Sequence, residues 1–169
     1  MKKVTMSLLA LFMITCGLQA QELPQPIPYA EVMQRIGLTD VTVEYSRPGV
    51  KGRTIFGGLE AYGEIWRTGA NASTKITLST DAKVGGVDVK AGTYSIFTIP
   101  GEEEWKVILN SDANAYESNY NAENNVAEVT LKGMKIDAVE TMTFYFANVK
   151  ENEAHLVFQW ETASWSLPI

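Results

Sequence analysis

The sequence contains very little cysteine and histidine, and this scarcity excludes several kinds of site. Cys16 is the only cysteine and His155 the only histidine among 169 residues. Thiolate and multi-histidine sites for zinc or iron require several such ligands, so we predict no metal and no cofactor. A catalytic serine would have only His155 as its base, and no Gly-x-Ser-x-Gly motif is present. His155 alternates with apolar residues of a predicted strand, which favours a histidine at the surface or the rim.

Apolar runs long enough to cross a bilayer are also missing. The longest run, residues 4–14, follows Lys2 and Lys3 and precedes short polar and small residues that end at Ala20. A spanning helix needs about 20 apolar residues, whereas this pattern is typical of a secretory signal peptide over residues 1–20. Cys16 has a poor context for lipidation, because it follows Met-Ile-Thr instead of a box that ends in a small residue. We therefore predict a periplasmic or extracellular protein without a transmembrane segment.

Positive charge is scarce in the predicted mature chain. The whole sequence has 14 basic and 20 acidic residues, and removal of residues 1–20 takes away two lysines, leaving 12 against 20 and a net charge of -8. Binding to nucleic acid or to an anionic membrane relies on an excess of Lys and Arg, so this balance argues against both partners. The same 149 residues contain no cysteine, so the domain must be stabilised by its core rather than by disulfides.

Long helical patterns are absent, and short runs of alternating apolar and polar residues take their place. Residues 30–37 fit a strand or one helical turn; we assign a strand that pairs with residues 41–45 through the turn GLTD. Gly85-Gly86 and Pro100-Gly101 mark two further hairpins. The remaining strands are predicted within residues 74–80, 83–89, 93–99, 105–110, 127–133, 141–149, 155–161 and 164–169.

About nine or ten short strands without a long helix predict an all-β protein, an antiparallel β-sandwich resembling a jelly roll. We expect one domain over residues 30–169, preceded by a proline-rich linker over residues 21–29. Trp105 and Trp160 occupy alternating strand positions that favour the core. Residues 110–125 form a long Asn-rich connection, in which Tyr116 and Glu117 stand where a calcium loop would need a ligand and a glycine.

Arginine and glycine are concentrated in one part of the chain. Three of the four arginines and six of the 13 glycines lie between residues 47 and 69, a stretch that includes most of YSRPGVKGRTIFGG and the start of WRTGANAST. We call residues 47–71 the Arg-Gly segment. Glycine permits tight turns, and guanidinium groups can grip a carboxylate, sulfate or phosphate with paired hydrogen bonds. The candidate ligand-binding residues are Arg47, Lys51, Arg53, Arg67 and Asn71.

Three functions remain open for this segment. The first is a binding module for a small anionic or carbohydrate ligand, or for a partner surface, in which the three arginines converge on one pocket. The second is a hydrolase of glycans or envelope polymers, which requires two carboxyl groups about 5–9.5 Å apart in a cleft beside the segment. The third is purely structural: the arginines pair with Glu44, Glu60 or Glu64 and hold a long loop on the sandwich.

The motifs of the segment also carry a resemblance. The run VTVEYSRPGVKGRTIFGGLEAYGEIWRTGANAST, followed by AGTYSIFTIPGEEEWKVILN and HLVFQWETASWSLPI, resembles the bacterial secreted family known as domain of unknown function 2911, over about residues 30–169. The resemblance implies an exported β-rich domain without an established activity. The family's long loop often carries a Trp-Gly pair where this chain has Tyr116-Glu117. The matching motif positions are Arg47, Pro48, Lys51, Gly52, Arg53, Gly57, Gly58, Tyr62, Gly63, Trp66, Arg67, Gly69, Ala70 and Asn71.

Overall fold

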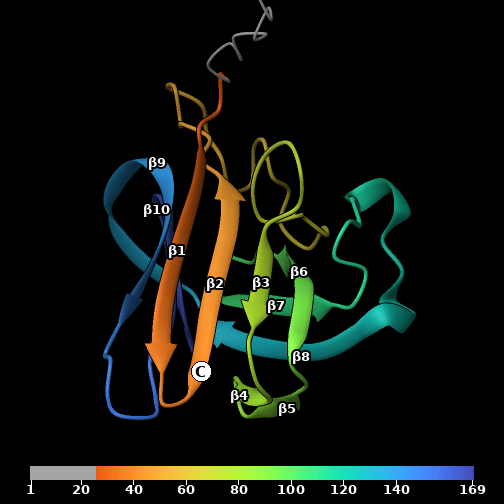
Figure 1. The fold of residues 1–169 in the computed structure, drawn as a ribbon. Helices are drawn as coiled ribbons and strands as arrows, with labels where there is room; N and C mark the ends of the chain where they lie inside the picture. The colour runs from red at the N-terminus through yellow and green to blue at the C-terminus, as the bar shows by residue number, and fades with distance from the viewer. Residues whose placement is uncertain (1–25) are drawn as a thin grey trace, which may run out of the picture.

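A computed structural model describes residues 26–169 and confirms the antiparallel all-β fold. Ten strands are present, within the predicted number (Figure 1). The predicted signal peptide and most of the proline-rich linker lie outside the described residues. The strands are β1 (Tyr29–Ile36), β2 (Thr39–Ser46), β3 (Lys75–Leu78), β4 (Ala82–Val84), β5 (Val87–Val89), β6 (Gly92–Ile99), β7 (Glu104–Asn110), β8 (Asn125–Lys132), β9 (Met134–Ala147) and β10 (His155–Pro168).

Six strands form the larger sheet, in the order β1-β2-β3-β6-β7-β8. All of its neighbouring strands are antiparallel, as expected for a chain that advances by hairpins. β1 and β2 are joined by the two-residue turn Gly37-Leu38, where Gly37 has a φ of 56°. Hairpin turns of this length favour glycine at such a position, because other residues are strained there. The strand assigned to residues 30–37 is therefore confirmed.

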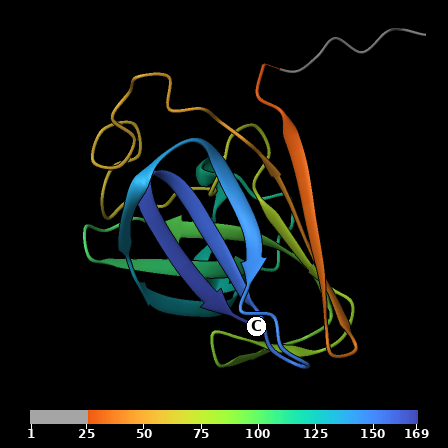
Figure 2. The ribbon, with the colours of Figure 1, turned by 90° about the vertical axis from the view of Figure 1, so that its left-hand side faces the viewer.

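β9 and β10 form a second, two-stranded sheet that covers the larger one, while β4 and β5 form a small separate hairpin. Figure 2 shows the β9–β10 pair in front of β6 and β7, crossing them at an angle. Two expectations need correction here. β9 begins at Met134 rather than at Thr141, and the runs at residues 155–161 and 164–169 belong to the single strand β10. β10 continues through irregular pairing near Glu161, which a sequence pattern reads as a break.

The core between the two sheets is rich in aromatic rings. Trp105 and Trp160 are 2% and 1% exposed, which confirms that both are core residues. Trp66 and Trp160 stack with their ring centroids 5.8 Å apart, so a residue of the Arg-Gly segment enters the same cluster. Such offset and edge contacts add to the stabilisation that burial of these large side chains already provides. The segment is therefore packed into the core rather than laid over it.

The connection after β7 holds two short 3₁₀ turns, η1 (Glu117–Asn119) and η2 (Ala122–Asn124). No group of three metal-binding side chains occurs within residues 26–169. None of the helical turns in this part of the chain is long enough to traverse a bilayer. His155 is half-buried on β10, where its Nδ1 lies 2.9 Å from Ser166 Oγ.

Candidate functional site

The Arg-Gly segment closes one end of the sandwich and contacts both sheets (Figure 1). Its first part lies against β9, where the backbone N–H of Val50 donates to the carbonyl of Glu140 at 2.8 Å. Its second part extends the ladder on β6, where Trp66 and Thr98 exchange two backbone hydrogen bonds of 2.8 Å. Gly63 N–H donates to the Pro100 carbonyl at 2.9 Å in the same direction. The segment thus bridges the two sheets.

All three arginines of the segment donate to backbone carbonyls, and Arg47 and Arg53 do so without a carboxylate among their hydrogen-bond partners. Arg47 Nε donates to the Met142 carbonyl at 3.0 Å, and its Nη2 donates to Thr143 Oγ1 at 2.8 Å, so this half-buried side chain attaches the segment to β9. Arg53 folds back on its own turn and donates to the carbonyls of Val50 at 3.0 Å and Gly49 at 2.7 Å. Neither guanidinium takes Glu44, Glu60 or Glu64 as its partner among these hydrogen bonds.

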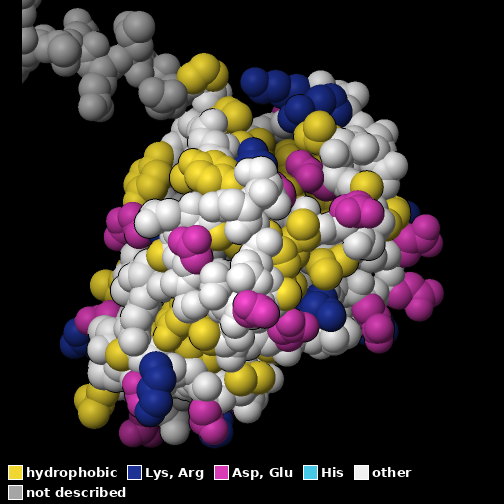
Figure 3. All heavy atoms as spheres, turned by 90° about the vertical axis from the view of Figure 1, so that its right-hand side faces the viewer, with side chains coloured by type: hydrophobic (Ala, Val, Ile, Leu, Met, Phe, Trp, Pro, Cys, Tyr) yellow, Lys and Arg dark blue, Asp and Glu magenta, His cyan; other side chains and the backbone are white. Residues whose placement is uncertain are grey.

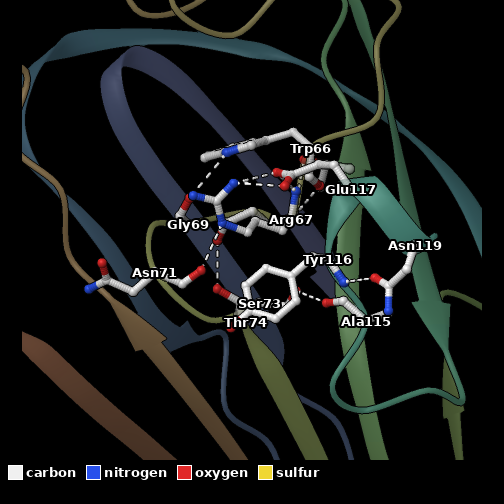
Figure 4. A network of polar contacts seen from close by, with 12 residues as sticks. Trp66, Arg67, Gly69, Asn71, Ser73, Thr74, Ala115, Tyr116, Glu117 and Asn119 are labelled. Atoms are coloured by element: carbon white, nitrogen blue, oxygen red, sulfur yellow. Dashed lines mark hydrogen bonds and ion pairs between the residues drawn. The ribbon is translucent and has the colours of Figure 1, made fainter.

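Arg67 attaches the segment to the connection after β7 (Figure 4). Its Nη1 lies 2.7 Å from both carboxylate oxygens of Glu117, and its Nε donates to the Asn71 carbonyl at 3.0 Å. Glu117 Oε1 also accepts the backbone N–H of Arg67 at 3.0 Å. Charge-assisted bonds of this kind are stronger than neutral ones. Glu117 is therefore the acidic partner of Arg67.

Lys51 and Asn71 shape the segment through an unusual backbone conformation. Both have positive φ angles, 50° and 59°, which few residues other than glycine, asparagine and aspartate adopt readily. The N–H of Lys51 donates to Glu140 Oε1 at 2.9 Å, and Asn71 Nδ2 lies 3.4 Å from Ser46 Oγ. The five candidate residues therefore all hold the segment in place. Their contact with a ligand stays a prediction.

Glu60 is an acidic residue whose pKa is affected by the charges of both Arg67 and Arg53. Its pKa is raised from 4.5 to about 7, chiefly by burial; the charge of Arg67 opposes this shift, Glu117 adds to it and Arg53 opposes it. A half-buried carboxyl that titrates near neutrality is uncommon and often belongs to a functional region. Figure 3 shows one group of Lys and Arg side chains at the end of the molecule that carries the segment, further basic side chains elsewhere on this face, and acidic side chains spread over much of it.

A cavity of about 400 Å³ lies between the turns of the segment, the β6–β7 connection and the irregular part of β10. Its lining combines apolar rings with polar and charged groups. The residues are Thr54, Phe56, Tyr62, Gly101, Glu102, Trp105, Gly133, Met134, Lys135, Glu161, Thr162 and Ala163. None of the five candidate residues is among them. Pockets for small ligands have this size and this mixture of apolar walls with a few polar groups.

Glu161 is positioned in this cavity by a distortion of β10. The pairing with β9 shifts on both sides of Glu161, whose φ is 53°. Its carboxylate accepts the consecutive backbone N–H groups of Ile55 at 3.0 Å and Phe56 at 3.3 Å. A β-bulge re-aims a side chain, and a strained φ persists only where the surroundings impose it. The bulge therefore anchors the Arg-Gly segment and places a carboxylate in the cavity wall.

The Tyr62 ring forms an exposed part of the same wall. It lies directly over Gly57, because a Cβ added at Gly57 would be 2.7 Å from Tyr62 Cε2. Gly57 also has a φ of 77°, so two independent features require glycine there. Tyr62 is 43% exposed, whereas Phe56 and Trp105 below it pack edge to face with centroids 4.8 Å apart. One accessible ring thus stands above a buried aromatic floor.

Sequence reasoning located the segment but not this cavity. Of the residues that line the cavity, Tyr62 stands among the motif positions, so the sequence indicated one part of the wall. Glu102 reads as one of three consecutive glutamates in a turn, and Glu161 reads as the polar end of a strand. Only the irregular β9–β10 pairing turns Glu161 toward the segment, and pairing between distant strands leaves no local pattern.

Comparison with known proteins agrees with this picture without adding an activity. A family model described as "Protein of unknown function (DUF2911)" matches residues 27–169, nearly all of the described chain. Neither the curated proteins nor the solved structures include a significant match. The match covers the sandwich, the Arg-Gly segment and every residue of the cavity. The chain belongs to the DUF2911 family, as its arginine and glycine motifs predict.

Proposed function

We propose that this chain is an exported binding module that takes a small carbohydrate-like ligand in the cavity beside the Arg-Gly segment. Export is inferred from the N-terminal sequence alone. The observation that carries the binding proposal is the composition of the cavity wall: one accessible tyrosine ring, two carboxylates, one amine and two threonine hydroxyls around about 400 Å³. Sugars offer hydroxyl groups to such donors and acceptors, and their apolar ring faces pack on aromatic side chains.

The charge of the wall favours a neutral ligand over an anion. Glu102 and Glu161 face Lys135 as the only basic residue in the lining, so an anionic ligand would meet net repulsion. The arginines that could bind an anion already donate to internal acceptors. Their part in the proposal is indirect: they hold the turn that carries Thr54, Phe56 and Tyr62.

The test is a binding titration with soluble neutral and acidic mono- and oligosaccharides. Tryptophan fluorescence should report binding, because Trp105 lies in the cavity floor. Tyr62→Ala should weaken binding at least tenfold, whereas Tyr116→Ala, which removes a similarly exposed tyrosine outside the cavity, should not. If Tyr62→Ala binds as the unmodified protein does, or if only acidic saccharides bind, the proposal is wrong.

Hydrolysis of a glycan is the second candidate, because the cavity wall holds two carboxylates. Glu161 is held beside the cavity by two backbone N–H groups, a fixed position that suits a nucleophile or base. Glu102 would then have to donate the proton to the leaving group. A time course of reducing-end release from any saccharide that binds decides between the candidates. Activity that is lost in Glu102→Gln but with binding retained would establish the enzyme.

A further inference from the structure

β1 forms one border of the six-stranded sheet, and half of its backbone groups point away from the sheet. Ile36 closes the hairpin with Thr39, and the Pro28 carbonyl accepts the N–H of Arg47, so the even-numbered residues of β1 face β2. The odd-numbered residues therefore direct their N–H and C=O groups outward. Figure 1 shows β1 at the border of the six-stranded sheet, and no described strand is hydrogen-bonded to its outer edge.

The open part of this edge runs from Tyr29 to Arg35. Beyond it, the Gly37 N–H donates to the Glu151 carbonyl at 2.9 Å, so the β9–β10 turn covers the end of the hairpin. The Arg35 carbonyl accepts Gln34 Nε2 at 2.9 Å, which leaves its second lone pair. The edge of a sheet is a template for another strand unless something blocks it.

Nothing in β1 blocks pairing in the usual way. The strand has no proline and no bulge, and it pairs with β2 in one uninterrupted register. Two large side chains of the outward set are exposed, Tyr29 at 61% and Met33 at 56%. The charges of the set are Glu31 and Arg35, which have opposite signs; a repelling edge would carry charges of one sign.

The spacing of these charges matches one partner, which is β1 itself. When two copies of β1 run antiparallel about Met33, Glu31 of each copy lies directly opposite Arg35 of the other. Opposite charges at facing positions stabilise a strand pair, and like charges destabilise it. A register shifted by four residues toward the N-terminus would place Glu31 opposite Glu31. Arg35 uses Nε and Nη2 for Asp40, at 2.6 Å each, and retains Nη1 for a second carboxylate.

We propose that this protein forms a two-fold symmetric dimer in which β1 pairs antiparallel with β1 of a second copy. The two six-stranded sheets then become one continuous sheet. Glu31, Met33 and Arg35 supply about six backbone hydrogen bonds across the axis. Two Glu31–Arg35 pairs flank a central contact between the two Met33 side chains. No residue that lines the cavity belongs to β1, so the cavity takes no part in this interface.

Analytical ultracentrifugation over a range from low micromolar to about 1 mM tests the proposal. The unmodified protein should sediment as a dimer that dissociates on dilution and more readily in high salt. Glu31→Arg alone and Arg35→Glu alone should each weaken the dimer at least tenfold, because each places like charges opposite one another. An equimolar mixture of the two variants should restore it, because the mixed dimer has two attractive pairs.

Proline at position 33 tests the backbone part of the interface. Met33→Pro removes an N–H that points away from β2, so the β1–β2 ladder keeps its donors while the second copy loses one. It should be monomeric, whereas Met33→Ala, which keeps the N–H, should still form dimers. Circular dichroism melting verifies that both variants are folded. A monomer at about 1 mM, or a mixture of the charge variants that stays monomeric, overturns the proposal.

Discussion

The two parts of the Arg-Gly segment are held by different means. Its second part joins the larger sheet through backbone ladder bonds, as at Trp66 and Thr98. Its first part also makes backbone bonds to β9, as at Val50 and Glu140, but it depends in addition on side chains: Arg47 binds β9, and Glu161 of β10 accepts the N–H of Ile55. We call the second part the ladder part and the first part the side-chain part. Backbone bonds tolerate most substitutions of side chains that point to solvent, whereas the side-chain part depends on individual residues. The cavity is built on the first part, which depends on these individual side chains.

The largest effect is expected where the ladder part enters the core. Trp66 is 2% exposed and packs against Phe56, Phe158 and Trp160. Trp66→Ala should lower the free energy of unfolding by about 3–5 kcal/mol, because it removes a large buried side chain and leaves a cavity. Urea denaturation followed by circular dichroism measures the change. A loss below about 1 kcal/mol would mean that the segment does not belong to the core.

Glu161 provides the matching test on the side-chain part. Glu161→Ala leaves the N–H groups of Ile55 and Phe56 without their acceptor, at a cost of about 2–3 kcal/mol. Glu161→Gln retains one acceptor oxygen and should lose less. The neighbouring exposed residue Thr162, changed to Val, serves as the control and should stay within about 0.5 kcal/mol. Equal stability of Glu161→Ala and Thr162→Val would contradict the anchoring role.

Arg67 and Glu117 test the attachment to the connection after β7. The two side chains are 28% and 30% exposed. Arg67→Ala should therefore lower the free energy of unfolding by about 1–2 kcal/mol, less than the loss of a partner from a fully buried pair. A double-mutant cycle with Glu117→Gln measures their coupling. Arg53→Ala, whose side chain binds only its own turn, should have a smaller effect. Unchanged melting of Arg67→Ala with altered saccharide binding would instead place Arg67 in a ligand site.

The smallest expected effect concerns Glu60 and depends on pH. Its pKa is raised in the folded protein, from 4.5 to about 7, so the folded state binds more protons than the unfolded state between these values. The contribution of Glu60 to stability is therefore full below pH 4.5 and is lost as the pH rises through about 7. Glu60→Gln should flatten this part of the stability profile, by about 1 kcal/mol after allowance for solvent screening.

Thermal melting at pH 4.5 and at pH 8 measures this difference for both proteins. The two should be close in stability at the lower pH, and Glu60→Gln should be the more stable at the higher pH. Glu64→Gln, on an exposed residue nearby in the sequence, is the control and should follow the unmodified protein. A parallel pair of profiles for Glu60→Gln and the unmodified protein would show that Glu60 keeps its ordinary pKa.

The regular parts of the fold could be predicted residue by residue. Val41, Val43 and Tyr45 alternate with polar residues and are buried, since a strand with one buried face imposes a period of two. Gly85-Gly86 and Pro100-Gly101 mark true hairpins for an equally local reason. The arginine partners were harder to predict, because Glu117 is 50 residues from Arg67 and competes in the sequence with nearer glutamates.

The sequence by itself determined the all-β class, the order of the hairpins, the burial of Trp105 and Trp160 and the position of the unusual segment. These properties depend on local backbone preferences and on the periodicity of apolar residues. Only the tertiary structure decided which acceptors the arginines take and that a cavity lies beside Glu161 and Tyr62 rather than among the guanidinium groups. Contacts between segments far apart in the chain depend on how the two sheets pack, and local patterns carry no record of that packing.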